Sequence, residues 1–372
     1  MKMKKQKKSF IIILLLFLLV GTIVICCGQK QKDKLFKKEF SFDRNLVNTK
    51  EPEFVCQLSE DSVLLKGIKN FTILNDTSFV VADGRGVYLY HISGTFKKQF
   101  GNLGQAGGEM IRPSIIYATS DYVYIWCSSM MKFLIFDHEA NFKYELTGFK
   151  RAVSKFVVNS SDEILYLYTA GFFDELNNKM FDVIEVFNIS DKSSKTFGER
   201  GPEDEVLSTY SNSSGLYIDM DRLIYLHPGN LIIYDHDLNS DETVRYKIDD
   251  KTFNTTTITS NVRDIMENFP KLADYLYKNS AVIDLYKDND QFFIVSEIGQ
   301  FDFDIQSGVM NTKERKVKLY ILDSSFTPNR TILFDYISSP NIVIYSGAMY
   351  FLTLNLGETD QTITLNRFSL VE

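Results

Sequence analysis

The sequence predicts an all-β protein: a six-bladed β-propeller, its ring closed by an N-terminal strand, with a short helical insertion between blades 4 and 5. Two observations carry this prediction. A strand motif recurs along the chain at a nearly constant interval, and a second strand-like run precedes each copy. Repeats at a fixed interval of roughly 40–50 residues are typical of propeller blades.

The recurring motif has the form apolar-x-apolar-aromatic, followed by a polar residue and a turn. Its aromatic residues are separated by 46, 51, 47, 86 and 48 residues. Four of these intervals match one blade of roughly 40–50 residues, and the long one requires an insertion. The aromatic residues of the six copies are Tyr90, Phe136, Phe187, Tyr234, Tyr320 and Phe368.

The run ahead of each copy is rich in β-branched and aromatic residues and is bounded by Asn, Asp, Gly or Ser. This composition is the signature of strands separated by turns. A fixed order of strands with a period near 47 residues favours a propeller over a sandwich or a barrel. The runs lie at 78–82, 122–126, 164–168, 223–226, 292–295 and 349–352.

The last copy of the motif is followed by only a few residues, so the last blade lacks an outer strand on its C-terminal side. Exposed sheet edges invite unwanted pairing. We therefore expect a strand within residues 38–59 to complete that blade, and we assign the propeller to residues 39–372.

The insertion at about 255–279 shows a different pattern. Apolar residues between Val262 and Leu276 recur at helical spacing, which predicts one or two short helices. Pro270 should interrupt the helix near Phe269. We expect these helices to pack as a lid on one face of the ring; a partner-binding helix is the alternative.

Residues 1–26 predict a signal peptide of the lipoprotein type. Five lysines precede an apolar run from residue 10 to residue 27, which ends in two cysteines. Cys27 is the expected lipid-attachment residue, with Cys26 as the alternative site. Because the run is long, an uncleaved membrane anchor remains an alternative, as does plain secretion.

Residues 27–38 are polar and lysine-rich, and we expect them to form a solvated tether. These assignments predict a cell-envelope protein, lipid-anchored to a bacterial membrane and facing the periplasm or the surface. The membrane, reached through the lipid, is therefore one expected partner.

The charge and the cysteines exclude several classes of function. A net charge of −7 opposes binding to nucleic acid. The chain has no C-x-x-C and no histidine spacing typical of a metal site, so we expect neither metal nor cofactor. Cys56 and Cys127 are expected to be separate buried thiols, with a disulfide as the alternative. We expect the histidines at turn positions, and the acidic runs 203–205 and 249–250 in solvated loops.

A glycine-rich loop from Gly101 to Glu109 joins the first copy of the motif to the second. It matches the dinucleotide-binding pattern only loosely and opens no long helix, so dinucleotide binding is not expected. Its glycines would permit positive φ where the chain crosses between blades, and a partial second copy at 198–203 favours this structural role. The structural glycines are Gly101, Gly104, Gly107 and Gly108, and the expected ligand-binding rim is Gln105, Glu109 and Arg112.

The strand ending in Tyr-His or Phe-Asp, the turn glycine and the loop G-x-x-G-x-x-G-G-E together resemble the six-bladed β-propeller lipoproteins of Bacteroidota, of the TolB-like and NHL-like kind. The family loop usually reads G-x-x-G-x-G-P-G-E, and this chain has Ala106 and Gly107 in place of the Gly-Pro. The resemblance covers about residues 50–372. It implies a cell-envelope protein and supplies no catalytic residues.

Two functions are compatible with these observations. The first is a non-enzymatic envelope module that binds a protein, peptide or glycan ligand at a propeller face. It is favoured because the sequence contains no recognisable catalytic constellation, including the G-x-S-x-G elbow. The alternative is an enzyme acting on glycans, a lyase or hydrolase, with acidic residues in the central channel. A strongly perturbed carboxylate pair in the channel would favour this alternative.

Overall fold

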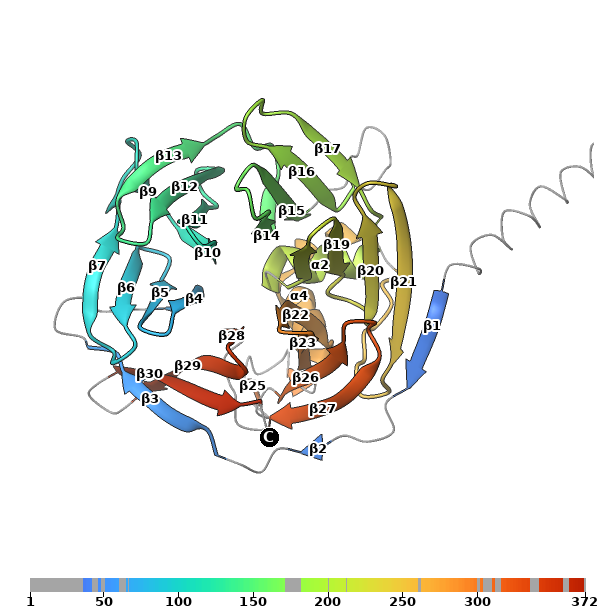
Figure 1. The fold of residues 1–372 in the computed structure, drawn as a ribbon. Coiled ribbons are helices and arrows are strands. Elements are labelled where there is room, and N and C mark those ends of the chain that lie inside the picture. Colours follow the sequence, from blue (N-terminus) through green and yellow to red (C-terminus); the bar gives the residue numbers. More distant parts are fainter. Residues whose placement is uncertain are drawn as a thin grey trace, which may run out of the picture.

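The computed structural model describes residues 36–41, 46–47, 51–59, 65, 67–170, 182–199, 201–211, 213–259, 262–299, 302–303, 310–311, 316–334, 341–356 and 361–370. Six sheets are arranged around a central axis, which confirms the predicted six-bladed propeller (Figure 1). The predicted signal peptide and Cys27 lie outside the described residues.

Each blade is a four-stranded antiparallel sheet that runs from the axis outward. Blade 1 consists of β4 (Asn70–Asn75), β5 (Ser78–Ala82), β6 (Val87–His91) and β7 (Phe96–Phe100). Blade 2 consists of β10 (Pro113–Ala118), β11 (Tyr122–Cys127), β12 (Lys132–Asp137) and β13 (Phe142–Leu146). Blade 3 consists of β14 (Ala152–Val158), β15 (Ile164–Ala170), β16 (Ile184–Asn188) and β17 (Ser194–Phe197).

The second half of the ring follows the same order. Blade 4 consists of β18 (Gly215–Asp219), β19 (Arg222–Leu226), β20 (Ile232–Asp237) and β21 (Glu242–Asp249). Blade 5 consists of β22 (Ala281–Asp288), β23 (Gln291–Ile298), β26 (Lys316–Asp323) and β27 (Pro328–Phe334). Blade 6 consists of β28 (Ile342–Tyr345), β29 (Ala348–Leu356), β30 (Gln361–Ser369) and, from the N-terminal region, β3 (Glu53–Gln57).

The recurring motif forms the third strand of each blade, and the run ahead of it forms the second. The polar residue at the end of the third strand closes the turn to the outer strand. In blade 2, Asp137 accepts hydrogen bonds from the backbone N–H groups of Glu139 and Asn141, at 3.1 and 2.8 Å. A short polar side chain is suited to this role because it bonds to the backbone two residues further on. Equivalent bonds are made by Asn188, Asp237 and Asp323.

The ring is closed by β3, which pairs antiparallel with β30, as predicted; Glu53 lies opposite Arg367. Cys56 and Leu58 are buried in the same apolar cluster as Tyr90 of blade 1. The closing strand therefore also fills the interface between the last blade and the first.

Two further N-terminal strands extend the sheets. β1 (Phe36–Ser41) pairs in parallel with β21 of blade 4, and β2 (Leu46–Val47) pairs in parallel with β27 of blade 5. Together β1, β2 and β3 run along the outside of blades 4, 5 and 6 in that order, and we call them the N-terminal belt (Figure 1). The end of the segment expected to be a tether thus forms the start of β1.

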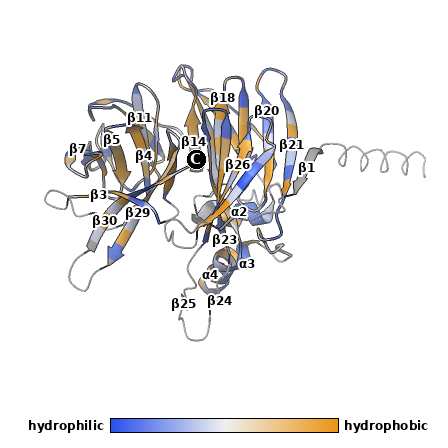
Figure 2. Ribbon diagram, turned by 60° about the horizontal axis from the view of Figure 1, so that its bottom comes forward, coloured by the Kyte–Doolittle hydropathy of each residue, from blue (hydrophilic) through white to orange (hydrophobic). Residues whose placement is uncertain are grey.

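The two faces of the ring differ. One face, the turn face, carries the tight turns between first and second strands and between third and fourth strands. The other, the loop face, carries the crossings between blades. The loop face also bears α2 (Pro202–Ser211), α3 (Val262–Met266), α4 (Phe269–Lys278) and the pair formed by β24 (Asp302–Phe303) and β25 (Met310–Asn311), which gather on one side of the ring (Figure 2).

The helical insertion lies between blades 4 and 5, as predicted. Pro270 stands in the first turn of α4 and separates it from α3, and the side chain of Asn268 caps α4 by accepting a hydrogen bond from Lys271 N at 3.2 Å. Leu272 and Tyr275 are buried in the same apolar cluster as strands of blade 5. The insertion is therefore packed onto the ring as a lid.

The core lies between successive blades, and the two cysteines within it are free and buried, as expected. The expectation that Asp250 lies in a solvated loop is wrong: its side chain is 5% exposed and pairs with the ammonium group of Lys318, which is 1% exposed. Tyr320 Oη donates a further hydrogen bond to this carboxylate at 2.9 Å. A charge at this depth is stable only when it is paired and hydrogen-bonded.

Candidate functional site

A groove of about 490 Å³ runs between blades 3 and 4, from the crossing on the loop face to the turn between β20 and β21 on the turn face. Its blade 3 wall is the end of β17 with the crossing that follows, and its blade 4 wall is formed by β19, β20 and β21. The neighbouring blades contact at this level through Phe197 and His236, whose rings stack at 4.1 Å.

The floor of the groove is a cluster of rings. Tyr225 and Tyr234 stack at 4.8 Å with an interplanar angle of 11°, and the ring of His227 meets Tyr234 edge-on at 4.7 Å. Arg245 places its guanidinium 5.4 Å from the centre of the Tyr234 ring, a cation–π contact. These packed rings hold their polar atoms in fixed positions.

The second glycine motif forms one side of the groove by opening helix α2. Pro202 occupies the first helical position, where its missing N–H costs nothing. Asp204, which is 4% exposed, accepts hydrogen bonds from Gly201 N and Gly229 N, both at 3.0 Å. Glu203 accepts one from Ile258 N at 2.7 Å.

The expectation that residues 203–205 form a solvated loop is therefore wrong. The carboxylates of Glu203 and Asp204 fix the crossing between blades 3 and 4 to two neighbouring loops, through Ile258 N and Gly229 N. The sequence carried the relevant signal, a proline followed by three acids, which is typical of a helix N-terminus.

The histidines of the groove also differ from expectation. His236 lies within β20 and not at a turn, and it is 2% exposed; His227 follows β19, next to a turn, and is 1% exposed. The hydroxyl of Tyr168 lies 2.7 Å from Nδ1 of His227. Burial lowers the pKa of His236, while Asp241 acts in the opposite direction. The His236 ring is therefore neutral at pH 7.

The rim of the groove is acidic. Glu199 and Asp241 are exposed, and their carboxylates add to those of Glu203 and Asp204. Burial raises the pKa of Tyr234, Arg245 opposes this increase, and the nearby carboxylates add to it. The tyrosine hydroxyl thus stays protonated, as a neutral hydrogen-bond donor.

The residues predicted as a ligand rim lie together elsewhere, in the crossing between blades 1 and 2. Gln105 and Arg112 are exposed, and neither they nor Glu109 line the groove. The carboxylate of Glu109 is half-buried and accepts a hydrogen bond from Ala106 N at 2.8 Å, which closes the loop on itself. Their role in binding a ligand stays a prediction.

Three of the four glycines expected to be structural, Gly101, Gly104 and Gly108, have positive φ, and Gly107 does not. β8 (Asn102–Leu103) pairs in parallel with β9 (Glu109–Met110) and folds the loop flat. Gly108 has φ +77°, and a Cβ there would lie 3.0 Å from the ring of Phe142. Gly101 and Gly104 also have positive φ, whereas Gly107 stands in open space.

The central channel contains carboxylates, but the described ones face lysines. Asp284 of β22 forms an ion pair with Lys155 of β14, across the channel between blades 5 and 3. Nearer the turn face, Asp219 pairs with Lys287 at 2.9 Å. Hydrolysis of a glycosidic bond usually requires two carboxyl groups that flank the same bond. The arrangement of Asp219 and Asp284 is that of structural ion pairs.

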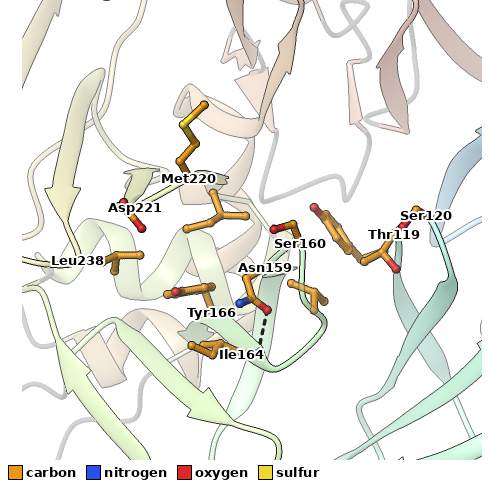
Figure 3. A pocket seen from close by; sticks show the side chains of 12 residues that line it. Thr119, Ser120, Asn159, Ser160, Ile164, Tyr166, Met220, Asp221 and Leu238 are labelled. Atoms are coloured by element: carbon orange, nitrogen blue, oxygen red, sulfur yellow. Dashed lines mark hydrogen bonds between the residues drawn. The ribbon is translucent and has the colours of Figure 1, made fainter.

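A second cavity, of about 710 Å³, lies on the turn face between blades 2, 3 and 4 (Figure 3). Its polar side chains mostly hold their own turns: Asn159 Oδ1 accepts hydrogen bonds from Glu163 N at 2.9 Å and Ile164 N at 3.0 Å. Asp221 is the one charged residue of its lining. The groove between blades 3 and 4 is therefore the richer in groups that can bind a ligand.

Within the described part of the chain, no cluster of three metal-ligating side chains occurs. None of the helices described is long and apolar enough to span a bilayer. The apolar run at residues 10–27 lies outside the described residues.

The ring and its inter-blade groove define this protein as a six-bladed β-propeller. A family model described as "6-bladed beta-propeller", DUF5128, matches residues 50–269. The chain belongs to this family. No curated protein sequence matches the chain significantly.

Solved structures show the same fold at low sequence identity. A protein of Bacteroides fragilis described as a "Putative exported protein" aligns with a TM-score of 0.60 and 15% identity, over 89% of this chain and 99% of that chain. A member of the DUF4221 family from Bacteroides vulgatus aligns with a TM-score of 0.59 and 10% identity, over 86% of this chain and 97% of that chain. At these identities, the similarity concerns the fold alone.

Proposed function

We propose that this protein is an exported, lipid-anchored propeller of the cell envelope that binds a peptide, protein or glycan ligand in the groove between blades 3 and 4. The observation that carries the binding role is a groove of about 490 Å³ whose ring and carboxylate groups are held in place by packing and hydrogen bonds. Clefts with a few fixed polar groups are the usual ligand sites of proteins.

Export is supported by the lysine-rich, apolar leader that ends at Cys26 and Cys27. The description of the Bacteroides fragilis relative as exported agrees with it. The Cys27→Ser variant should lose acyl labelling and accumulate as the unprocessed precursor. Acylation and normal processing of that variant would contradict the assignment, and Cys26→Ser serves as the matched control.

Binding in the groove can be tested by filling it. Thr243 lines the groove on β21, and Thr243→Trp should abolish binding of any ligand that a panel of envelope oligosaccharides and peptides identifies. Ser120→Trp, in the turn-face cavity, is the matched control. Loss of binding in Ser120→Trp but not in Thr243→Trp would move the site to the turn-face cavity.

The enzyme alternative has a distinct readout in the same panel. A glycan lyase and a hydrolase would both produce new reducing ends, and a lyase alone would also produce unsaturated non-reducing ends, whereas a binding module leaves the glycan intact. Turnover that is lost in Asp284→Asn, with the fold retained, would replace the binding proposal by catalysis in the channel.

A further inference from the structure

The groove between blades 3 and 4 and the turn-face cavity meet at the turn between β20 and β21. Every second side chain of β20 faces blade 3. Tyr234 and His236 are successive members of this series and line the groove. Leu238, the next member and the first residue after the strand, lines the turn-face cavity (Figure 3). Because a strand advances about 3.4 Å per residue, a ligand that extends along the groove reaches the cavity within about 7 Å.

The cavity contains a buried hydroxyl group without a hydrogen-bond partner. Tyr166 of β15 lines the cavity and is 4% exposed, and its hydroxyl makes no hydrogen bond with another described residue. Burial raises the pKa of Tyr166, and the carboxylate of Asp221 adds to this increase, so the hydroxyl is a neutral donor at pH 7. Buried polar groups in proteins are nearly always hydrogen-bonded, so this hydroxyl favours a ligand that accepts its hydrogen bond.

Asp221 supplies the complementary group. Its side chain is exposed, and its carboxylate makes no hydrogen bond or ion pair with another described residue. Figure 3 shows Tyr166, Asp221 and Leu238 on one side of the cavity, with Thr119 and Ser120 on the opposite side. No lysine or arginine is among the described residues that line the cavity. An anionic ligand would therefore be repelled without gaining a partner, whereas a hydroxyl group of a neutral ligand can donate to the carboxylate.

The backbone of the lining turns has little to offer a peptide. Asn159 N donates to Ile164 O at 3.1 Å, and Leu238 N donates to Asp221 O at 2.8 Å, so these groups are used within the turns. Bound peptides usually pair with a free sheet edge or lay a helix in an apolar groove. The cavity instead presents a hydroxyl and a carboxylate beside the aliphatic side chains of Ile218 and Leu238. This combination suits a sugar ring, which carries hydroxyl groups and an apolar C–H face.

These observations name the class of ligand for the binding site. We propose, building on the ligand-binding function above, that the ligand is a neutral glycan that lies along the groove and places its terminal sugar in the turn-face cavity. Hydroxyl groups of that sugar bond to Tyr166 and Asp221. The rest of the chain passes the turn between β20 and β21 and continues past Thr243, so both hollows contribute to one site.

Trisaccharides and a peptide of comparable length test the class of ligand. The neutral probes are cellotriose, mannotriose, xylotriose, the N-acetylglucosamine trimer and any neutral glycan that the panel identifies. The galacturonate trimer is the anionic probe, and tri-alanine is the peptide probe. In calorimetric titrations of residues 28–372, we expect at least one neutral glycan to bind and the other two probes not to bind. Salt should change the affinity little, because an uncharged ligand carries no charge to be screened.

The decisive variant removes one oxygen atom. Tyr166→Phe keeps the ring and should weaken binding of the neutral glycan about tenfold, as expected for one hydrogen bond from a buried donor. Because this hydroxyl has no partner among the described residues, the melting temperature should not fall. Tyr90→Phe is the matched control: its hydroxyl is also buried without a partner in the described part of the chain, but it lies between blades 6 and 1. Ser120→Trp stays a control as well, since Ser120 lies across the cavity from Tyr166 (Figure 3).

The outcomes separate the inference from the function beneath it. If Thr243→Trp abolishes binding and Tyr166→Phe leaves the affinity unchanged, the ligand stays within the groove, and the inference fails while the proposed function stands. If only tri-alanine, a panel peptide or the galacturonate trimer binds, the class of ligand is wrong. Equal losses in Tyr166→Phe and Tyr90→Phe would also reject the contact with Tyr166. If no probe and no panel member distinguishes the wild type from Thr243→Trp, the proposed function fails together with the inference.

Discussion

The two halves of the ring solve the problem of exposed sheet edges differently. In blades 1–3 the outer strands β7, β13 and β17 each pair only with the third strand of their own blade among the described strands, so their outward edges are uncovered, and each of these strands carries lysine. In blades 4–6 the N-terminal belt supplies the outermost strand. Charge discourages pairing with another chain, whereas coverage removes the edge. The belted half also carries α3, α4 and the β24–β25 pair, while the crossing between blades 1 and 2 is a flat glycine loop.

Removing the belt should have the largest effect. A chain lacking residues 28–59 loses β3 and leaves an apolar interface open between blades 6 and 1, so we expect aggregation or loss of cooperative melting. A chain lacking only residues 28–50 keeps β3 and should melt cooperatively at a lower temperature. Calorimetry of both truncations distinguishes the effect of closing the ring with β3 from the effect of covering the edges of blades 4 and 5 with β1 and β2. An unchanged melting temperature in the longer truncation would contradict the role of β3.

In blades 1–3, whose outer edges the N-terminal belt does not cover, Gly108→Val should strongly destabilise the protein. The residue has φ +77° and the ring of Phe142 lies 3.0 Å from a Cβ at this position, so we expect a loss of about 2–3 kcal/mol in the free energy of unfolding. Gly107→Val, with open space and no positive φ, is the control and should stay within about 0.5 kcal/mol. Urea denaturation measures both. Equal effects would show that this loop rearranges freely.

The two blade crossings can be compared through one carboxylate each. The two carboxylate oxygens of Asp204 each accept a hydrogen bond from a backbone N–H group. In Asp204→Asn the side-chain NH2 faces one of these donors, so the free energy of unfolding should fall by about 1–3 kcal/mol. Glu109→Gln affects one such group at a half-exposed position and should cost about 0.5–1.5 kcal/mol. Asp221→Asn, on the turn face, is the control. A larger loss for Glu109→Gln than for Asp204→Asn would reverse the ranking of the two crossings.

The smallest expected effect is a difference between the rates at which Cys56 and Cys127 are chemically labelled. Burial raises the pKa of Cys56 in β3 to about 11 and that of Cys127 in β11 to about 12, so neither thiol should react in the native state at pH 8. Labelling then requires local opening. We expect Cys56 to be modified faster, since β3 is an edge strand and β11 is interior. Mass spectrometry of a leaderless protein measures both rates, and faster labelling of Cys127 would contradict the expected weakness of the closure.

The ring was predictable because its determinants are local and repeated. Each third strand carries its own aromatic anchor and turn-closing residue, so Tyr90 or Phe136 can be recognised without knowledge of the partner strand. The need for β3 followed from counting strands. The pairing of β1 and β2 with blades 4 and 5 escaped prediction because a strand of a few residues can pair with any free edge, and the choice of edge depends on contacts roughly 200 residues or more away in sequence.

The groove was less predictable for a similar reason. The second glycine motif was visible in the sequence, but Glu203 and Asp204 looked like ordinary solvated acids. Their burial depends on Ile258 and Gly229, which approach only when blades 3, 4 and 5 are assembled. The positions of Gln105, Glu109 and Arg112 in one crossing were predictable because they are neighbours in sequence. Their distance from the groove was not, because it is set by the closed ring.

The belt also fixes the order in which the protein can mature. Its strands are the first part of the propeller to be synthesised, yet β30, the partner of β3, comes roughly 300 residues later. At about 5–20 residues per second, the ribosome needs on the order of 15–60 s to reach that partner. Throughout this interval β3 has no sheet to join, although the partners of β1 and β2 are made earlier. The apolar residues of β3 must therefore be kept from other chains until the last blade has been made.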